Sequence, residues 1–586
     1  MWCSLEGAVF FRIKQSGPRS YLQIVENQRD GAAVRQNVIA TLGRADDLAV
    51  RGALASLLAS GARFCDQVML LSTLQADIDG PRLLARRVGP PLLFGRLWEE
   101  TGCQAVITAL LAGRAFEFPV ERAIFATVLH RIMVSGADRA CEKWMVDYDI
   151  PGCDGLALHH LYRAMAWIGE ELPADQQAGA TPFAPRTVKD LIEERLFAER
   201  RDLFSELSVV FMDTTSLSFT GSGGEALGER GYSKDHRPDL MQMILGVVID
   251  AAGRPICSEM WPGNTADVGV LMPVVERLRS RFGIGRVCVV ADRGMISAPT
   301  IAALEERGLQ YVLGARERTD TLVRRVVLND SRAFTPLCIS RSDGEETQLF
   351  IKEVLVEGRR YVVCRNEAEA AKDQADRQAI VAALDAQLKR GDKALIGNSA
   401  YRRFLRRTSE TRAFEIDPGK LADEARFDGI FVLRTNARVT PLQAVLRYRD
   451  LIQVEQLFRT AKSLMRTRPI YHSSDSAIRG HVFCSFLALL LRKELDRRCR
   501  RAGFTPEWGD VLRDLDRLQR ATIEHAGKTW TVRTQADGCA AALVQAAGIA
   551  LSPRVQATPP PLPPPSTPSL PPIRRRGRPR RSATRS

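Results

Sequence analysis

The spacing of apolar and polar residues changes along the chain, and each change predicts a different kind of structure. Residues 8–42 alternate between apolar and polar, with turn signals at Ser16-Gly17-Pro18 and Asp30-Gly31, which predicts a small meander of strands. From about residue 45 to 205 apolar residues recur at helical spacing, as in LAVRGALASLLASGARF and ERAIFATVLHRIMVSG. We therefore predict a small β module at 1–45 and a helical region at 46–205.

Strand-like runs return after residue 206. The runs LSVVFMDTTSLSF, MQMILGVVID and RPICSEMW are followed by the helical run DVGVLMPVVERLRSRFG, the strand VCVVADRG, the helix APTIAALEERG and the strand LQYVLGA. Three consecutive strands followed by alternating helices and strands is the element order of a ribonuclease-H-like core, an α/β fold with a mixed sheet and flanking helices. In that fold the first and fourth strands lie side by side. Residues 206–316 are therefore predicted to form the first part of such a core.

The predicted core is interrupted by residues 317–427. Strand patterns such as TQLFIKEVLVEGRRYVVCR and the charged helical run EAEAAKDQADRQAIVAALDAQLKR indicate an inserted mixed domain that contains strands. The core resumes at the strand FDGIFVLRTN, and residues 428–550 supply its second part with the C-terminal helices. Residues 551–586 are rich in proline and arginine and cannot form a packed core, which predicts a disordered basic tail.

Composition adds a class of partner to this predicted fold. The chain has 586 residues, a formal net charge of +14 and a pI of about 9.4, which favours a polyanionic partner. Its twelve cysteines show neither close pairs nor metal-ligand spacing with the seven histidines, so we expect reduced residues. No apolar run is long enough for a membrane span, and the N-terminal residues do not read as a secretory signal. We predict a cytoplasmic protein with no membrane partner.

Two aspartates follow apolar strands of the predicted core. Asp213 lies late in the first strand and Asp292 ends the fourth, so the expected strand order brings the two carboxylates together. Taken singly, Asp213 could cap a turn with Thr214 and Thr215, and Asp292 could pair with Arg293 or start a loop. Taken together, two acids that converge at the ends of buried strands repel each other unless a cation lies between them. A divalent metal ion would satisfy both.

A third acid lies on the single helix predicted within YRDLIQVEQLFRTAKSLMRTRPIYH, which Pro469 ends. Apolar residues at helical spacing predict a buried face, and Glu455 is the only acid on the neighbouring, otherwise basic face. One interpretation is a helix-stabilising pair between Glu455 and Arg459, four residues further on. The other is a metal ligand that completes a set with Asp213 and Asp292.

The spacing within this helix resembles a known signature. Tyr448, Glu455 and Lys462 occupy the Tyr, Glu and Lys positions of the pattern Tyr, two residues, Arg, three residues, Glu, six residues, Lys. This pattern marks one branch of the DDE-class transposases of bacterial insertion sequences. Leu451 stands at the arginine position, which leaves that role open to neighbouring arginines. Further stretches that resemble the family are VVFMDTTSLSF, GYSKDHRPDLMQ, WPGNTAD, VVADRGMIS, FDGIFVLRTN and RPIYHSSDSAIRGH.

The resemblance implies a metal-dependent enzyme that cleaves and joins DNA. A ribonuclease-H-like core interrupted by a mostly β insertion would hold two Mg²⁺ ions, for which Mn²⁺ can substitute, between Asp213, Asp292 and Glu455. Asp213 would bridge both ions, and Asp292 and Glu455 would hold one each. The same site would hydrolyse a phosphodiester and transfer the freed 3′ end to target DNA.

The resemblance also implies double-stranded DNA as the partner, both the terminal inverted repeats of an insertion sequence and the target DNA. The protein would act as a synaptic homodimer in the bacterial cytoplasm, in association with the nucleoid. The helical region at 46–205 is a candidate for reading the ends. The candidate DNA-contact residues in the core are Tyr448, Lys462, Arg459, Arg466, Lys234, His236 and Arg237.

The tail carries a further short motif. Arg576-Gly577-Arg578-Pro579 resembles an AT-hook, an extended segment that lies in the narrow minor groove of A·T-rich DNA. The alternative is a basic tail that binds any polyanion through counterion release. Either interpretation makes Arg576 and Arg578 candidates for DNA contact.

Two other functions stay open from the sequence. A stand-alone nuclease on the same core would hydrolyse DNA without joining it. A catalytically silent DNA-binding regulator, produced by a decayed element, would do neither. Because all three acids, Lys462 and the stretches around them are present, we favour an active transposase that performs cut-and-paste transposition.

Overall fold

The structure is a computed structural model, and it describes residues 9–30, 33–44, 82–178, 180, 184–200, 209–284, 287–340, 346–389, 401, 403–407, 414–525 and 528–558. Contacts within the chain separate two compact units. The first comprises the described residues within 1–87, 517–536 and 551–586, and the second those within 88–516 and 537–550. We take each unit in turn.

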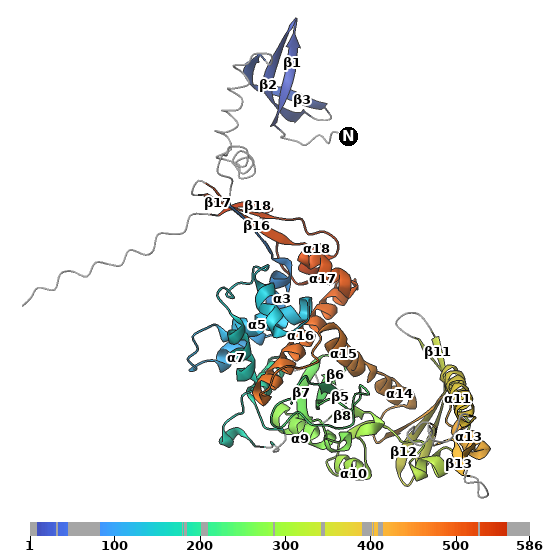
Figure 1. The fold of residues 1–586 in the computed structure, drawn as a ribbon. Helices are drawn as coiled ribbons and strands as arrows, with labels where there is room; N and C mark the ends of the chain where they lie inside the picture. Colours follow the sequence, from blue (N-terminus) through green and yellow to red (C-terminus); the bar gives the residue numbers. More distant parts are fainter. Residues whose placement is uncertain are drawn as a thin grey trace, which may run out of the picture. The chain divides into compact units, whose positions relative to one another are not determined.

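A three-stranded antiparallel sheet opens the first unit (Figure 1). Its strands follow in the order β1 (Val9–Ser16), β2 (Arg19–Asp30) and β3 (Ala33–Arg44). Ser16 pairs with Arg19, so Gly17 and Pro18 form a two-residue turn. Gly17 has a φ of 61°, a conformation that glycine adopts without strain. The predicted meander is confirmed.

A second sheet in this unit corrects two predictions. Its order is β18-β17-β16-β4, with bounds β4 (Arg82–Arg87), β16 (Gln519–His525), β17 (Lys528–Arg533) and β18 (Val555–Thr558). β4 lies in the segment predicted to be helical, and β18 lies in the tail predicted to be disordered from residue 551. Both strands pair with the β16–β17 hairpin, a distant partner that overrides the local pattern. Residues 559–586, with Arg576 and Arg578, lie outside the described residues.

The second unit begins at residue 88 with the part of the predicted helical region that does consist of helices. Its helices are α3 (Gly89–Glu100), α4 (Cys103–Leu110), α5 (Val120–Met133), α6 (Asp138–Met145), α7 (Leu158–Ile168) and α8 (Val188–Arg200). The long helix α16 (Asp475–Arg501) packs between α5 and α7 with a buried apolar interior. The run LAVRGALASLLASGARF lies outside the described residues.

A nine-stranded sheet forms the centre of this unit, in the order β10-β11-β12-β15-β9-β8-β5-β6-β7 (Figure 1). Its strands are β5 (Val209–Ser218), β6 (Gln242–Asp250), β7 (Pro255–Pro262), β8 (Cys288–Ala291), β9 (Gln310–Gly314), β10 (Thr335–Ser340), β11 (Glu346–Val356), β12 (Arg359–Asn366) and β15 (Ile430–Thr435). β5 pairs in parallel with β8, and Met212 lies opposite Ala291. The expected neighbours, first and fourth strand, are therefore confirmed, as is the mixed α/β class.

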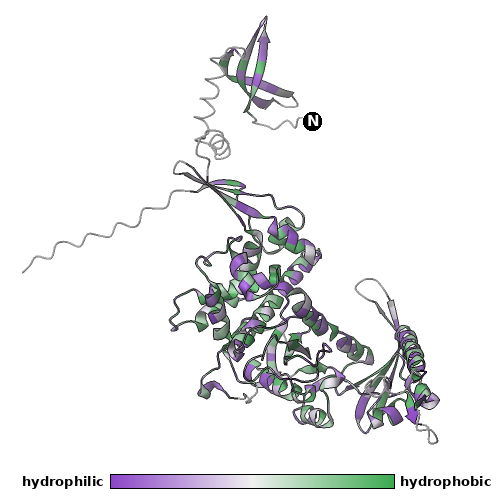
Figure 2. Ribbon diagram, in the orientation of Figure 1, coloured by the Kyte–Doolittle hydropathy of each residue, from purple (hydrophilic) through white to green (hydrophobic). Residues whose placement is uncertain are grey.

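Helices cover both faces of this sheet. One face carries α9 (Leu271–Phe282) and α10 (Ala298–Glu306), and the other carries α14 (Pro441–Arg449), α15 (Ile452–Arg459) and α16. In Figure 2 these helices show both hydrophilic and hydrophobic colours, as expected when one side of a helix rests on a sheet. Side chains alternate along β5, so Asp213 shares with Phe211 the face that α15 covers.

The segment predicted as an insertion extends the central sheet. β12 pairs with β15, so β10, β11 and β12 continue the sheet beyond the strand where the predicted core resumes. The predicted charged helix is α11 (Glu367–Leu388), and it is followed by the short hairpin β13 (Leu405–Arg407) and β14 (Phe414–Ile416) and by α13 (Pro418–Ala425). The core and the inserted strands thus form one continuous sheet.

Buried charged side chains link α8 to β7 and to α9. Lys189 Nζ donates to the backbone oxygen of Ser258 in β7 at 2.7 Å and lies 3.1 Å from Oδ1 of Asp190. Arg277 of α9 donates to the same Asp190 oxygen at 3.0 Å. A buried charge is costly without its partner, so these contacts hold α8, β7 and α9 in one arrangement.

Two global features follow from the described residues. The ten cysteines among them are free, and eight are buried, as expected for reduced core residues. None of the helices within these residues combines the length and the apolar character that crossing a membrane requires.

Candidate active site

Asp213 lies near the middle of β5, where the strand carries it onto the face covered by α15. Its Oδ1 accepts a hydrogen bond from the backbone N–H of Thr214 at 2.7 Å. Burial raises the pKa of Asp213 to about 6, against the lowering effect of Lys234 and of the Thr214 N–H, and the charges of Asp292 and Glu455 raise it further. The carboxyl is therefore desolvated and has two acids near it.

Asp292 follows β8 directly and reaches the same edge of the sheet. Because Met212 lies opposite Ala291, Asp213 and Asp292 are the next residues on two adjacent parallel strands. The hydroxyl of Tyr448 donates to Oδ1 of Asp292 at 2.9 Å. The alternative pairing with Arg293 does not occur, since Arg293 donates to Glu317 at 2.8 Å instead.

Glu455 reaches the site from α15, which packs on β5 and β6. Its side chain is exposed, and within the described part of the chain it makes no hydrogen bond or ion pair. The alternative of a helix-stabilising pair with Arg459 is therefore not realised. Glu455 is near enough to Asp213 for its charge to raise the pKa of that carboxyl.

The three acids do not form a compact cluster of ligand atoms. A set of three His, Cys, Asp or Glu ligand atoms that all lie within 4.8 Å of one another occurs once among the described residues, and it does not contain these acids. The ligand atoms of these acids therefore do not all lie within that distance of one another. Hard carboxylate oxygens that are partly desolvated and repel one another fit divalent ions such as Mg²⁺.

The helix that was predicted from Tyr448 onward is broken in the structure. Tyr448 belongs to α14, a turn at Asp450 and Leu451 follows, and after α15 the chain continues as a π-helix, η7 (Thr460–Leu464). A π-helix adds a residue to the turn and so changes the direction of the side chains after it. The single-helix prediction was wrong because local spacing does not show where tertiary contacts interrupt a helix.

The direction set by η7 points Lys462 at the loop after β5. Its Nζ donates to Oδ1 of Asp235 at 2.9 Å, and Arg468 pairs with the other oxygen of the same carboxylate. Burial lowers the pKa of Lys462, and Asp235 opposes this effect. Arg459 and Arg466 are exposed beside it.

Comparison with known families decides to which class of protein this arrangement belongs. Residues 204–491 match the family described as transposase DDE domain, and residues 11–77 match the family described as IS1634 family transposase, N-terminal domain. The two matches together span more than half of the chain. The chain belongs to the IS1634 family of DDE transposases. No curated protein matches it significantly. The transposase is thus a phosphoryl-transfer enzyme of a class that binds DNA and uses divalent metal ions.

Lys234 of the transposase was a candidate for DNA contact, and the structure directs its ammonium toward the acids. Lys234 Nζ donates to the backbone oxygen and to Oγ1 of Thr214, both at 2.7 Å, and lies 3.8 Å from Oδ1 of Asp213. The next candidates, His236 and Arg237, are exposed, and Arg237 pairs with Asp239 at 2.7 Å.

Sequence reasoning missed Asp267, a fourth acid at the edge of the site. Its Oδ1 accepts from the hydroxyl of Thr214 at 2.7 Å, and its Oδ2 lies 3.3 Å from Lys234 Nζ. Asp267 ends the stretch WPGNTAD, which resembles the family, so a signal was present. The stretch did not by itself suggest a role for Asp267, because an acid after a turn signal is common at the start of a helix.

The compact ligand set elsewhere in the transposase is Asp138, His472 and His481. Arg131 donates to Oδ1 of Asp138 at 2.7 Å and approaches Nδ1 of His481 at 2.8 Å. Burial opposes ionisation of Asp138, but Arg131, His481 and His472 together outweigh this effect, so the pKa of the carboxyl is lowered. A guanidinium already supplies the positive charge there. The cluster therefore links α5 and α6 to α16. Nε2 of His481 also lies 3.1 Å from the backbone oxygen of Thr467.

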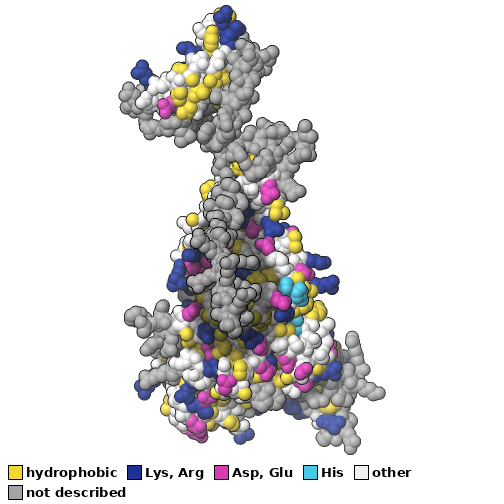
Figure 3. All heavy atoms as spheres, turned by 90° about the vertical axis from the view of Figure 1, so that its left-hand side faces the viewer, with side chains coloured by type: hydrophobic (Ala, Val, Ile, Leu, Met, Phe, Trp, Pro, Cys, Tyr) yellow, Lys and Arg dark blue, Asp and Glu magenta, His cyan; other side chains and the backbone are white. Residues whose placement is uncertain are grey.

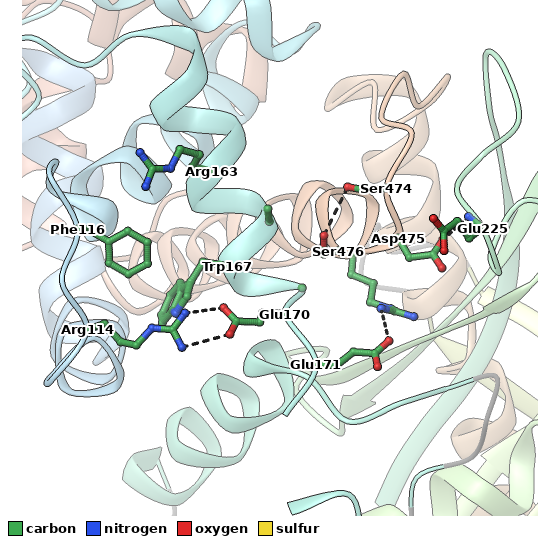
Figure 4. A pocket seen from close by; sticks show the side chains of 13 residues that line it. Arg114, Phe116, Arg163, Trp167, Glu170, Glu171, Glu225, Ser474, Asp475 and Ser476 are labelled. Atoms are coloured by element: carbon green, nitrogen blue, oxygen red, sulfur yellow. Dashed lines mark hydrogen bonds and ion pairs between the residues drawn. The ribbon is translucent and has the colours of Figure 1, made fainter. Parts of the chain in front are cut away.

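A cavity of about 610 Å³ lies between α7 and the start of α16 (Figure 4). Its charged side chains largely neutralise one another, since Arg114 donates to both oxygens of Glu170 and Arg479 lies 3.2 Å from Glu171. None of the acids of the candidate active site lines it. In Figure 3, Lys and Arg are mixed with Asp and Glu over the part of this face that is drawn in colour.

Proposed function

We propose that the transposase binds the terminal inverted repeats of its own insertion sequence and moves that element by cut-and-paste transposition. The observation that carries this proposal is the position of Asp213, close enough to both Asp292 and Glu455 for their charges to raise its pKa. A DNA-binding regulator has no need for three acids that repel one another at one place. An enzyme that binds divalent ions at this place needs such a group of acids.

In this proposal, Asp213, Asp292 and Glu455 would hold the Mg²⁺ ions. Mn²⁺ would substitute because it accepts the same oxygen ligands. When bound, the ions would supply charge stabilisation for the scissile phosphate and activation of the attacking hydroxyl.

The chain's own residues orient these ligands. The Thr214 N–H fixes Oδ1 of Asp213, and the Tyr448 hydroxyl fixes Oδ1 of Asp292. The strand pair β5–β8 brings the two aspartates onto adjacent strands, and α15 carries Glu455, whose charge acts on Asp213. Such hydrogen bonds hold carboxylates in one orientation, so that less reorganisation is needed when the reaction begins. Water would attack in the cleavage step, and a freed 3′ hydroxyl in the joining step.

We assign the DNA contacts to basic side chains around this site. Arg459 ends α15, Lys462 lies in η7 and Arg466 follows η7. His236 and Arg237 lie on the exposed loop after β5. They would neutralise phosphates near the cleaved end, which positions the duplex without reading its bases. The helical region at 46–205 would read the ends, and the segment 551–586 with Arg576 and Arg578 would add non-specific affinity.

The proposal includes a synaptic homodimer that brings two transposon ends together in the bacterial cytoplasm, close to the nucleoid. The catalytic core would consist of residues 206–316 and 428–550, around the segment 317–427. The small β module at 1–45 completes this division of the chain.

The test is a reaction with purified transposase, a duplex that carries the inverted repeats found beside its coding region, unrelated target DNA, and Mg²⁺. The proposal predicts cleavage at the repeat ends and joined products in which a 3′ end is linked to target DNA. A pre-cleaved end supplied in a parallel reaction separates the two steps. Cleavage without any joining would indicate a nuclease, and binding without either reaction would indicate a regulator.

A further inference from the structure

The ammonium of Lys234 lies near two carboxylates, of which only one belongs to a proposed metal ligand. One is Asp213, a metal ligand of the proposed function, at 3.8 Å, and the other is Asp267, at 3.3 Å. Asp267 begins η3 (Asp267–Gly269), just ahead of α9 and therefore on a different element from the proposed metal ligands. Neither the family match nor the sequence assigns Asp267 a role.

A network of hydrogen bonds fixes this geometry. The hydroxyl of Thr214 donates to Oδ1 of Asp267 and accepts from Lys234 Nζ, each at 2.7 Å. The backbone oxygen of Thr214 accepts a second hydrogen bond from the ammonium, at 2.7 Å. The backbone N–H of Lys234 donates to Oγ of Ser216 at 3.0 Å, which anchors the loop to β5. The ammonium therefore has defined partners besides Asp213.

A fixed positive charge next to Asp213 competes with a divalent ion for the same carboxylate. The two cations repel each other strongly at such distances, because the site is partly removed from water. The affinity of Asp213 for metal then depends on how far the ammonium is held from it. Asp267 is the only carboxylate besides Asp213 with which Lys234 forms an ion pair among the described residues.

We propose that Asp267 is a positioning residue of the catalytic site, which draws the Lys234 ammonium away from Asp213 and thereby sets the affinity of the site for divalent metal. The inference rests on the proposed function, because it takes Asp213 to be a metal ligand. When the ion binds, the ammonium stays on Asp267 and Thr214. Without Asp267, Asp213 is the one carboxylate left to hold it.

The test measures Mn²⁺ binding to the full-length, DNA-free transposase by electron paramagnetic resonance of the unbound ion. Lys234→Met is expected to bind Mn²⁺ at least about tenfold more tightly than the wild type, since the competing charge is gone. Asp267→Asn is expected to bind it several-fold more weakly. In the double variant, Asp267→Asn should lose most of that effect, because its action passes through Lys234.

Two results would overturn the inference. One is an Asp267→Asn effect of equal size with and without Lys234, which would mean that Asp267 acts through its own charge or as a ligand. The other is a Lys234→Met variant that binds Mn²⁺ no more tightly than the wild type. Lys143→Met, which removes an exposed lysine of α6, is the matched control and should leave the affinity unchanged. Melting temperatures without metal show that each variant is folded.

Asp213→Asn separates this inference from the proposed function. If it removes the Mn²⁺ site while Lys234→Met changes nothing, the metal site stands and only the role of Asp267 falls. If Asp213→Asn binds Mn²⁺ as the wild type does, the proposed metal site falls, and the inference falls with it.

Discussion

The hydroxyl of Tyr448 donates a 2.9 Å hydrogen bond to Oδ1 of Asp292, joining two residues that are 156 positions apart in the sequence. Burial raises the pKa of Tyr448 well above its usual value, and the charge of Asp292 raises it further, so the hydroxyl remains a donor at every working pH. A β-carbon added to Gly314 would lie 2.5 Å from this hydroxyl. The glycine at the end of β9 thus makes room for the contact.

Replacing Tyr448 with Phe should lower the cleavage rate about tenfold, because loss of a hydrogen bond to a metal-binding carboxylate typically costs this much or more. DNA affinity should stay the same. Gly314→Ala, which displaces the hydroxyl without removing it, should act in the same direction. Rates on a pre-formed protein–DNA complex, together with binding curves, check both. A variant with weaker DNA binding and an unchanged rate would make Tyr448 a phosphate contact instead.

The raised pKa of Asp213 makes the folding stability of the protein depend on pH. Its pKa of about 6 in the folded protein exceeds the usual 3.8, so between these pH values the folded state holds more protons than the unfolded state. Stability of the metal-free protein is therefore lost as pH rises from about 4 to 6, and stays lost above. Asp213→Asn should recover up to about 3 kcal/mol at pH 7.5.

Urea unfolding without metal, at pH 7.5 and at pH 4.5, measures this difference. The advantage of the Asn variant should be largest at pH 7.5 and should shrink at pH 4.5, where Asp213 is mostly protonated in the folded state. An advantage of equal size at both values would show that ionisation of this carboxyl is not its cause.

Asp235 competes with DNA phosphates for Lys462 and Arg468, since it pairs with both. Asp235→Asn should therefore raise DNA affinity several-fold, and Lys462→Ala should lower it and reduce the salt slope by about one. Binding titrations at several salt concentrations measure both effects. Asp423→Asn, which frees Arg324 on an exposed surface, is the matched control. Tighter binding by the control as well would mean that net charge alone is responsible.

The C-terminal segment should divide into two functional parts. Removing residues 559–586 should lower non-specific DNA affinity and its salt dependence while catalysis continues, because cations are lost from outside the core. Removing residues from 551 onward also deletes β18, whose Val555 packs in the cluster around buried Trp530, and should lower thermal stability as well. Salt slopes and melting curves of the two truncations test this division. Identical melting curves would contradict a structural role for β18.

Sequence reasoning succeeded where local patterns fix the structure. The strand runs around Asp213 and Asp292 and their order predicted that the two strands would be neighbours, which β5 and β8 confirm. It failed where distant partners decide. The strands β4 and β18 pair with the β16–β17 hairpin, and the local spacing did not show the break between Tyr448 and Glu455. The sequence likewise did not predict the pairing of Lys234 with Asp267, because the two residues lie on separate segments that only the fold brings together.

The most direct test of the metal site exchanges its ligands one at a time. Asp213→Asn, Asp292→Asn and Glu455→Gln should each reduce Mg²⁺-dependent cleavage about a thousandfold or more while DNA binding persists, since several kcal/mol of charge stabilisation are lost. Cysteine at the same positions should be inactive with Mg²⁺ and regain activity with Mn²⁺ or Zn²⁺, because a thiolate prefers softer ions. Near wild-type cleavage with Mg²⁺ by any of the amide variants would remove that residue from the site and contradict the account.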